Sequence, residues 1–421
     1  MRNAIYYLQN EAIKAQLSET NRNQFDPVNP HSSLQGSLKG IILDLRSNPG
    51  GLLTSAVDVS SLFVPKDSDI VSARGRGFPG IVYRSKVDPM VDPTQTKVAV
   101  LVNGQTASAA EIVSGAIQDL DVGVIVGSDR TFGKGLVQNV QDLPFDTALK
   151  FTVAKYYTPS GRCIQSTKYK EGELSSSTSQ DKVNDGRYQA TKVSESERKL
   201  FFTKNGREVR DGGGIEADFK VDASKASALE VTLLRSNILS DFAAEWSKTH
   251  ELNIDSKKGD LYEIDDATYQ SFKRYVMKKN EDGEFTLDAL YRNPLKQLQD
   301  SLKKSGYALS SKEAKRLESS IVLEMQKDFV RYENDIKEDI GNNILARYLP
   351  ESMLIERGLK NDKQVLAAVS LLKDRRKFDT LLARSESTSK SAFMANGDVP
   401  STNIAKMQRG NIEGASININ W

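Results

Sequence analysis

Short apolar runs mark the first half of the chain, at residues 41–45, 98–102 and 122–126. Runs of about five such residues, bounded by turn residues, are typical of strands that are buried on both faces. Between the second and third runs, apolar residues recur at helical spacing and form one stripe, made of Ala109, Ile112, Val113, Ala116 and Ile117. Alternating strands and helices of this kind predict an α/β fold with a mostly parallel sheet covered by helices.

The pattern changes after about residue 134. Leu149, Phe151 and Val153 alternate with polar residues, which indicates strands with one solvated face. Residues 166–212 are rich in Ser, Lys, Asp and Gly, and we expect a surface insertion there. Together with the preceding strands, this segment completes a predicted core domain over residues 37–225.

The remainder of the chain divides into one helical region and two polar ends. Residues 226–384 are predicted to be α-helical, and a capping box of Ser310 and Glu313 opens a helix with an apolar stripe. Residues 1–36 read as a remnant or linker. Residues 385–421 hold too few apolar groups to offset the entropy of ordering, which predicts a disordered tail.

Composition excludes several classes of function. The chain has 58 Lys and Arg against 56 Asp and Glu, so its net charge of +2 gives no reason to expect nucleic acid as a partner. A single cysteine, Cys163, excludes an internal disulfide, and no ligand spacing predicts a metal or other cofactor. No apolar run approaches the roughly 20 residues of a membrane helix. The two histidines, His31 and His250, lie outside any structured apolar context.

Ser108 is the first residue that could do chemistry. It follows a buried strand and a turn of small residues, and it stands where the next helix begins. That position surrounds a hydroxyl with unpaired backbone N–H groups at the positive end of a helix. The alternative is that Ser108 is an ordinary helix N-cap, as serines at helix starts usually are.

Lys134 lies between two glycines, Gly133 and Gly135, and follows a buried strand. The segment does not fit a phosphate-binding loop, because Gly127 is too far from Gly133 and no Ser or Thr follows the lysine. An exposed turn lysine remains the simpler alternative. Gln138 comes four residues later, so in an extended strand it faces the same way as Lys134.

The third segment, residues 44–52, ends a strand in a turn that contains Gly50 and Gly51. Free N–H groups presented at one sheet edge could stabilise an oxyanion. A tight turn between a strand and a helix explains the two glycines equally well.

Together these segments resemble the C-terminal processing (tail-specific) serine peptidases. The resemblance rests on residues 45–52, 103–112 and 131–138, in this order, and also on residues 156–162 and 213–218, so it covers about residues 38–225. It implies a crotonase/ClpP-like fold and an endopeptidase that cuts proteins near their C-termini through an acyl-enzyme, with protein or peptide substrates. By position in the motifs, the resemblance makes Ser108 the nucleophile and Lys134 the general base. Gln138 then orients the lysine, and Ala109 with Gly50 or Gly51 forms the oxyanion hole.

The chemistry sets a condition on the site. Lysine accepts a proton only when it is neutral, so its usual pKa of about 10.4 must fall to roughly 7–8 through burial. Such a fall requires a dry site without a neighbouring carboxylate. The absence of Asp and Glu from residues 131–139 agrees with that requirement.

Alternatives from other classes stay open. Such peptidases usually carry an upstream PDZ domain, and the roughly 39 residues before the core are too few for a domain of at least about 50 residues. An inactive truncated fragment is one reading, and a catalytically silent binding protein on the same fold is another. In a third reading the helical region mediates homo-oligomer or adaptor contacts. A Ser-x-x-Lys match at Ser301 and Lys304 lies in a charged helical stretch and reads as chance. The resemblance also implies a location outside the cytoplasm, in the periplasm, envelope or thylakoid lumen.

Overall fold

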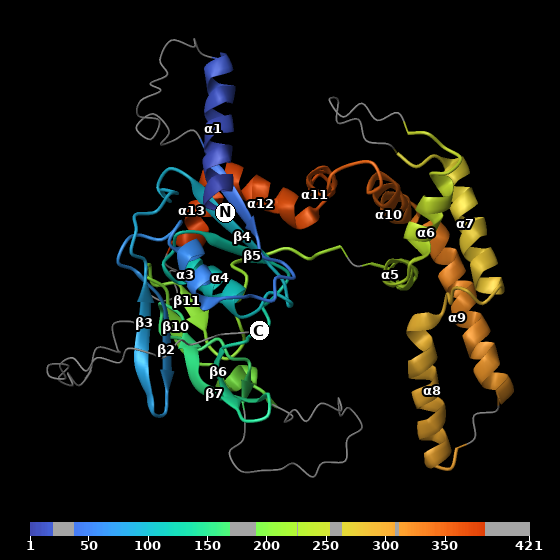
Figure 1. Ribbon diagram of the computed structural model, residues 1–421, viewed down its shortest axis with the longest axis horizontal. Coiled ribbons are helices and arrows are strands. Elements are labelled where there is room, and N and C mark those ends of the chain that lie inside the picture. The colour runs from blue at the N-terminus through green and yellow to red at the C-terminus, as the bar shows by residue number, and fades with distance from the viewer. Residues whose placement is uncertain (20–37, 169–190, 225, 253–262, 308–310, 384–421) are drawn as a thin grey trace. The chain divides into compact units, whose positions relative to one another are not determined.

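The computed structural model describes residues 1–19, 38–168, 191–224, 226–252, 263–307 and 311–383 (Figure 1). The chain forms two compact units. The first comprises Met1–Ala223 and Lys363–Trp421, and the second comprises Ser224–Asp362. The predicted disordered tail and the middle of the predicted insertion lie outside the described residues.

A four-stranded parallel sheet forms the centre of the first unit, in the order β1-β4-β5-β12. Its strands are β1 (Gly40–Asp44), β4 (Lys97–Val102), β5 (Val124–Gly127) and β12 (Phe219–Lys220). The first three coincide with the apolar runs of the sequence. All three are parallel as expected, and β4 and β5 are buried, whereas β1 lies at the edge of the sheet and is only partly buried.

Both faces of this sheet are covered. Alternate residues of β4 point to opposite sides, so Val98 and Val100 join one apolar cluster whereas Ala99 and Leu101 join another. Helices α3 (Leu53–Ser60) and α4 (Ala109–Asp119) supply the first cluster. Helices α12 (Lys363–Lys373) and α13 (Arg375–Leu382), red in Figure 1, supply the second. The sequence placed these last two helices in a separate helical region, and the structure corrects that boundary.

A second four-stranded sheet is antiparallel, with the order β3-β2-β7-β6. It consists of β2 (Asp69–Gly75), β3 (Phe78–Arg84), β6 (Leu136–Leu143) and β7 (Thr147–Tyr157). The outer halves of β6 and β7 are exposed on both faces, and Leu149 and Phe151 are themselves exposed, so the expectation of one buried face is wrong in this part of the hairpin. The expectation of a mostly parallel fold is therefore right for one of the two large sheets and wrong for the other.

The described part of the expected surface insertion is tied to the core. It contains β8 (Thr167–Lys168), β9 (Thr191–Lys192), a 3₁₀ turn (Glu195–Glu197), β10 (Leu200–Phe202) and β11 (Glu208–Arg210). Arg207 is 8% exposed and reaches Asp121 at 2.6 Å and Asp218 at 2.5 Å. An arginine with two carboxylate partners satisfies its charge in a buried position. The described part of residues 166–212 is thus anchored to the core by buried ion pairs and is not a free surface loop.

The second unit is helical throughout its described residues. Its helices are α5 (Ala228–Arg235), α6 (Ile238–Trp246), α7 (Asp266–Glu281), α8 (Ala289–Lys304), α9 (Ser311–Arg331), α10 (Glu333–Leu345) and α11 (Glu351–Leu359). Along α9, Met325 and Phe329 are buried in the core of the unit, whereas Leu317 is 42% exposed. The apolar stripe predicted for this helix is therefore buried in its C-terminal half only. Helix α1 (Arg2–Glu19) belongs to the first unit, where Ile5 is buried.

None of the helices in the described residues is long and apolar enough to cross a bilayer.

Candidate active site

Ser108 lies at the turn between strand β4 and helix α4, with φ of 57° and ψ of −116°. A positive φ is uncommon for a residue with a side chain and costs about 1–3 kcal/mol. The same kind of strained strand-to-helix turn presents the nucleophile in hydrolases with a nucleophile elbow. Small neighbours make the turn sterically feasible, since Ala107 and Ala109 flank the serine.

The Ser108 hydroxyl is buried and has no hydrogen-bond partner among the described residues. An N-cap serine would accept a hydrogen bond from the first turn of the helix. At Ser108 the backbone donates instead: its N–H bonds to Glu111 Oε2 at 2.8 Å, and the serine hydroxyl is not part of the cap. A buried hydroxyl without a partner in a strained turn does not stabilise the helix, which argues against the N-cap interpretation.

The Glu111 carboxylate joins the serine turn to the lysine segment. Besides the Ser108 N–H, it accepts the N–H of Lys134 at 2.8 Å and the N–H of Gly133 at 2.7 Å. The Thr131 hydroxyl is a fourth donor. Glu111 is fully buried, so a single side chain fixes where these two segments lie relative to each other.

Burial raises the pKa of Glu111, and the four donated hydrogen bonds act in the opposite direction. Sequence reasoning did not include Glu111 among the site residues. Its signal was present, because Glu111 stands three residues after Ser108, where a capping-box glutamate belongs. The pattern showed the local contact but not the contact with residues 131–134.

The other end of α4 is fixed by an ion pair. Arg162 Nη2 lies 2.7 Å from Asp119 Oδ1, and neither side chain is exposed to solvent. Arg162 Nη2 also donates to Gln118 Oε1 at 2.7 Å. Removal of one partner of such a pair usually destabilises a protein by about 3–5 kcal/mol. The helix that carries Ser108 is therefore held at both ends by charged side chains.

Lys134 is half-buried and stands just before strand β6, with Gly133 and Gly135 pressed against the neighbouring residues 164–166. The glycines allow this close approach, because a Cβ at Gly133 would come within 2.4 Å of the Ser166 Cβ. Ser108 Oγ makes no hydrogen bond to Lys134 in this conformation. Gln138 is half-buried on β6 and pairs with Thr152 after a register shift.

The two glycines of residues 44–52 differ in their surroundings. A Cβ at Gly50 would lie 2.8 Å from the Ala109 N and 2.9 Å from the Ser108 Cβ, whereas a Cβ at Gly51 would meet nothing within 4 Å. Gly50 also has a positive φ of 96°. Its N–H donates to Asn48 Oδ1 at 2.9 Å. Gly50 is therefore the glycine that packs on the serine.

A pair of variants tests this difference. Gly50→Ala should lower peptide hydrolysis by about 100-fold or more, because its Cβ would push against Ser108 and Ala109 and about 1 Å of misplacement can cost that much. Gly51→Ala should retain activity within a few-fold, because its Cβ enters open space. Steady-state kinetics on one peptide measures both. Equal losses in the two variants would contradict the assigned contact.

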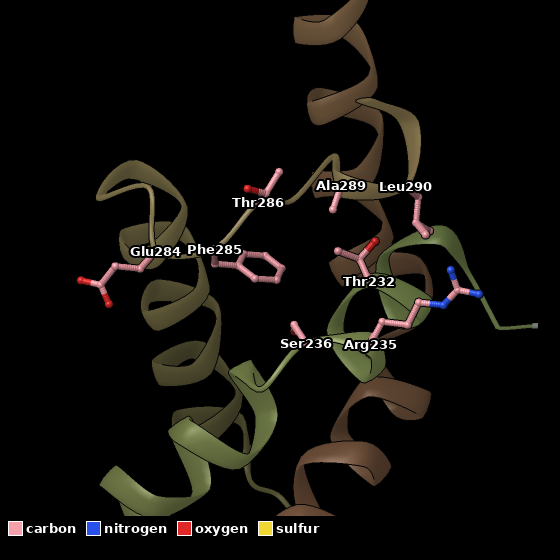
Figure 2. A pocket seen from close by; sticks show the side chains of 8 residues that line it. All are labelled: Thr232, Arg235, Ser236, Glu284, Phe285, Thr286, Ala289 and Leu290. Carbon is pink, nitrogen blue, oxygen red and sulfur yellow. The ribbon is translucent and has the colours of Figure 1, made fainter. Parts of the chain in front are cut away.

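Neither His250 nor the cavity of the second unit offers a second reactive site. His250 stacks on Trp246 in the second unit, with ring centroids 4.4 Å apart, and His31 lies outside the described residues. A cavity of about 370 Å³ in the second unit is lined by Thr232, Arg235, Ser236, Glu284, Phe285, Thr286, Ala289 and Leu290 (Figure 2). The hydroxyls of Thr232 and Ser236 donate to backbone carbonyls, so neither is poised as a nucleophile. Within the described ranges, no His, Cys, Asp and Glu cluster could hold a metal ion.

Comparison with known proteins finds a family match within the first unit. Residues 16–171, here called the S41 region, match the family model described as peptidase family S41. This part of the chain is therefore similar to peptidase family S41. Ser108, Glu111 and Lys134 all lie within this S41 region. Residues 229–372 match a second model, described as "Probable PDZ-protease, C-terminal helical domain".

Curated proteins similar to parts of this chain are named as proteases. A carboxy-terminal-processing protease of Bartonella bacilliformis is 46% identical over 129 residues, which is 30% of this chain and 29% of that protein. A probable CtpA-like serine protease of Staphylococcus haemolyticus is 29% identical over 254 residues, or 60% of this chain and 47% of that one. The chain thus spans less than half the length of either relative.

Among solved structures, the photosystem II D1 C-terminal processing protease is 38% identical to the matched part of this chain. The match covers 30% of this chain and 32% of that chain, with a TM-score of 0.27. The family assignment therefore rests on the sequence matches.

Proposed function

We propose that this chain is the catalytic part of a serine endopeptidase that hydrolyses peptide bonds near protein C-termini. The observation that carries the proposal is the Ser108 hydroxyl, which is buried without a partner in a strained turn. Through Glu111 that turn is bonded to the segment that carries Lys134. The names of the relatives supply the preference for C-termini.

In the proposed reaction, the Ser108 hydroxyl attacks the carbonyl carbon of the scissile bond. The neutral amine of Lys134 takes the hydroxyl proton and later gives it to the leaving amine. Collapse of the tetrahedral intermediate breaks the C–N bond and leaves an ester on Ser108. Water, deprotonated by the same lysine, then attacks the ester carbonyl. The C–O bond to Ser108 breaks, the lysine returns the proton to the Ser108 oxygen, and the new C-terminus is released. Proton transfer requires Lys134 to come within hydrogen-bond reach of Ser108 Oγ, a contact that the two side chains do not make at rest.

The N-terminal end of α4 supplies stabilisation for the oxyanion. Ala109 is the first residue of that helix, so its N–H has no acceptor inside the helix. In our proposal it donates to the oxyanion together with a glycine of the facing turn. Gly51 is the better candidate for the second donor, because the Gly50 N–H already donates to Asn48. Gln138 orients Lys134 from strand β6.

Some properties extend from the same proposal. A crotonase/ClpP-like relationship is supported by the parallel sheet with helices on both faces. A location outside the cytoplasm follows from the lumenal and envelope relatives that such peptidases have. Oligomer or adaptor contacts through the second unit are compatible with its match to a helical domain of PDZ proteases. A silent binding protein is disfavoured, because a binding role gives no reason for a strained serine beside a glycine-flanked lysine.

The test is a digestion followed by mass spectrometry. The chain is incubated with an unfolded protein of known sequence, and the new ends are mapped over time. We expect the first cuts near the C-terminus of the substrate, with no cuts by the Ser108→Ala protein, in which the rate should fall by at least about 1,000-fold. Equal cleavage by Ser108→Ala would exclude Ser108 as the nucleophile. First cuts spread evenly along the substrate would contradict the preference for C-termini.

A further inference from the structure

Two large apolar side chains stand exposed in the segments that flank Ser108. Leu52 is 53% exposed and Phe132 is 60% exposed. Phe132 stands between two buried residues, Thr131 and Gly133, and Leu52 directly precedes the buried Leu53. A single exposed apolar residue needs no explanation, but a pair of them beside a candidate nucleophile requires one.

Both residues are held in place by the serine turn itself. The N–H of Phe132 donates to the carbonyl of Thr106 at 2.9 Å, two residues before Ser108. Its own carbonyl accepts the Ser166 hydroxyl at 3.1 Å. On the other segment, the carbonyl of Asn48 accepts the Ala107 N–H at 2.9 Å. The two segments therefore bond to adjacent residues of the serine turn, and each presents its apolar side chain from a fixed backbone.

Neither helix capping nor core packing explains why an apolar residue stands at position 52 or 132. Leu52 occupies the N-cap position of α3, where Ser, Thr, Asp or Asn would accept a hydrogen bond that leucine cannot. Phe132 leaves most of an aromatic ring in water, where it does not contribute to the core. Residues that break a local rule in this way are most often found at functional sites.

We propose that Leu52 and Phe132 are specificity-determining residues that receive apolar substrate side chains next to the scissile bond. The inference rests on the proposed peptidase function and deepens it. It names the substrate class as extended segments with Leu, Ile, Met or Phe beside the bond that is cut. Burial of such a side chain against the two residues adds binding that a polar or small side chain cannot supply.

The test compares two peptides that differ only by Leu or Ala at a position flanking the scissile bond, with each flanking position examined in turn. For the wild type, kcat/KM should be at least about tenfold higher with Leu at one or both positions. Leu52→Ala or Phe132→Ala should reduce that ratio by about tenfold, mainly through KM. Phe132→Leu, which keeps an apolar side chain, should retain most of it.

The β6–β7 hairpin offers matched controls. Leu149→Ala and Phe145→Ala remove a leucine that is 52% exposed and a phenylalanine that is 95% exposed. Both controls should leave the Leu-to-Ala ratio unchanged. An active Leu52→Ala, Phe132→Ala double variant with the wild-type ratio would overturn the proposal while leaving the peptidase function standing. An equal decrease in kcat/KM for the Leu and the Ala peptide in these variants would show that the two residues have a structural role only. An inactive wild type would overturn the proposed peptidase function itself.

Discussion

Changing Lys134 to arginine should abolish peptide hydrolysis as completely as changing it to alanine. Arginine keeps the positive charge and nearly the length of lysine, but it cannot release its proton at any accessible pH. A general base at this position is lost in both variants, and we expect a decrease of at least about 1,000-fold in kcat/KM. In the wild type, kcat/KM should rise with pH through an apparent pKa well below about 10.4.

The measurement uses one peptide from about pH 6 to 10 for the wild type and each variant. His250→Ala is the control, because a histidine-based mechanism would make that variant inactive and leave Lys134→Arg active. His250 stacks on Trp246 and bonds locally, so we expect wild-type kinetics from its removal. Turnover by Lys134→Arg near the wild-type rate would exclude the Ser/Lys mechanism.

Glu111→Gln should damage the site although the two side chains have almost the same shape. Each carboxylate oxygen accepts two hydrogen bonds, and at least one donor at each oxygen is a backbone N–H. In either orientation the glutamine NH₂ would face a backbone N–H, leaving a buried donor without a partner. One such donor costs about 1–3 kcal/mol, and the misplaced segments should lower kcat/KM by about 100-fold or more.

Urea unfolding and peptide kinetics, measured on the same preparations, check both effects. Glu208→Gln provides the control, because Glu208 is exposed on β11 and should tolerate the change without loss. Full activity in Glu111→Gln would show that the two segments keep their positions without the carboxylate.

Much of the central architecture could be predicted from apolar patterning. Strands β1, β4 and β5 and helix α4 each carry a pattern that only a buried element satisfies. Strands β2 and β3 were not predicted, because charged residues and glycines interrupt their apolar positions and leave neither a continuous apolar run nor a strict alternation. Helices α12 and α13 were expected as helices, but periodicity does not reveal which surface an apolar stripe contacts.

The site shows the same division. Ser108, Lys134, Gly50 and Ala109 were found because each lies at the end of a regular element, and chain order then linked their motifs. Glu111 was not expected at the site, and its carboxylate accepts the backbone N–H of Lys134 although residues 131–139 contain no Asp or Glu. A window along the sequence contains only neighbours in the chain, and this contact spans 23 residues.

The late position of α12 and α13 has a consequence for synthesis of the protein on the ribosome. Residues Ser224–Asp362 must be translated after the parallel sheet is complete and before its second cover is made. At about 5–20 residues per second, those roughly 140 residues take about 7–28 s. During that interval the sheet face with Ala99, Leu101, Val124 and Val126 has no helices to cover it. The nascent chain therefore exposes an aggregation-prone apolar surface until α12 and α13 are synthesised. This exposure lasts longer than it would if the two helices directly followed β12 in the sequence.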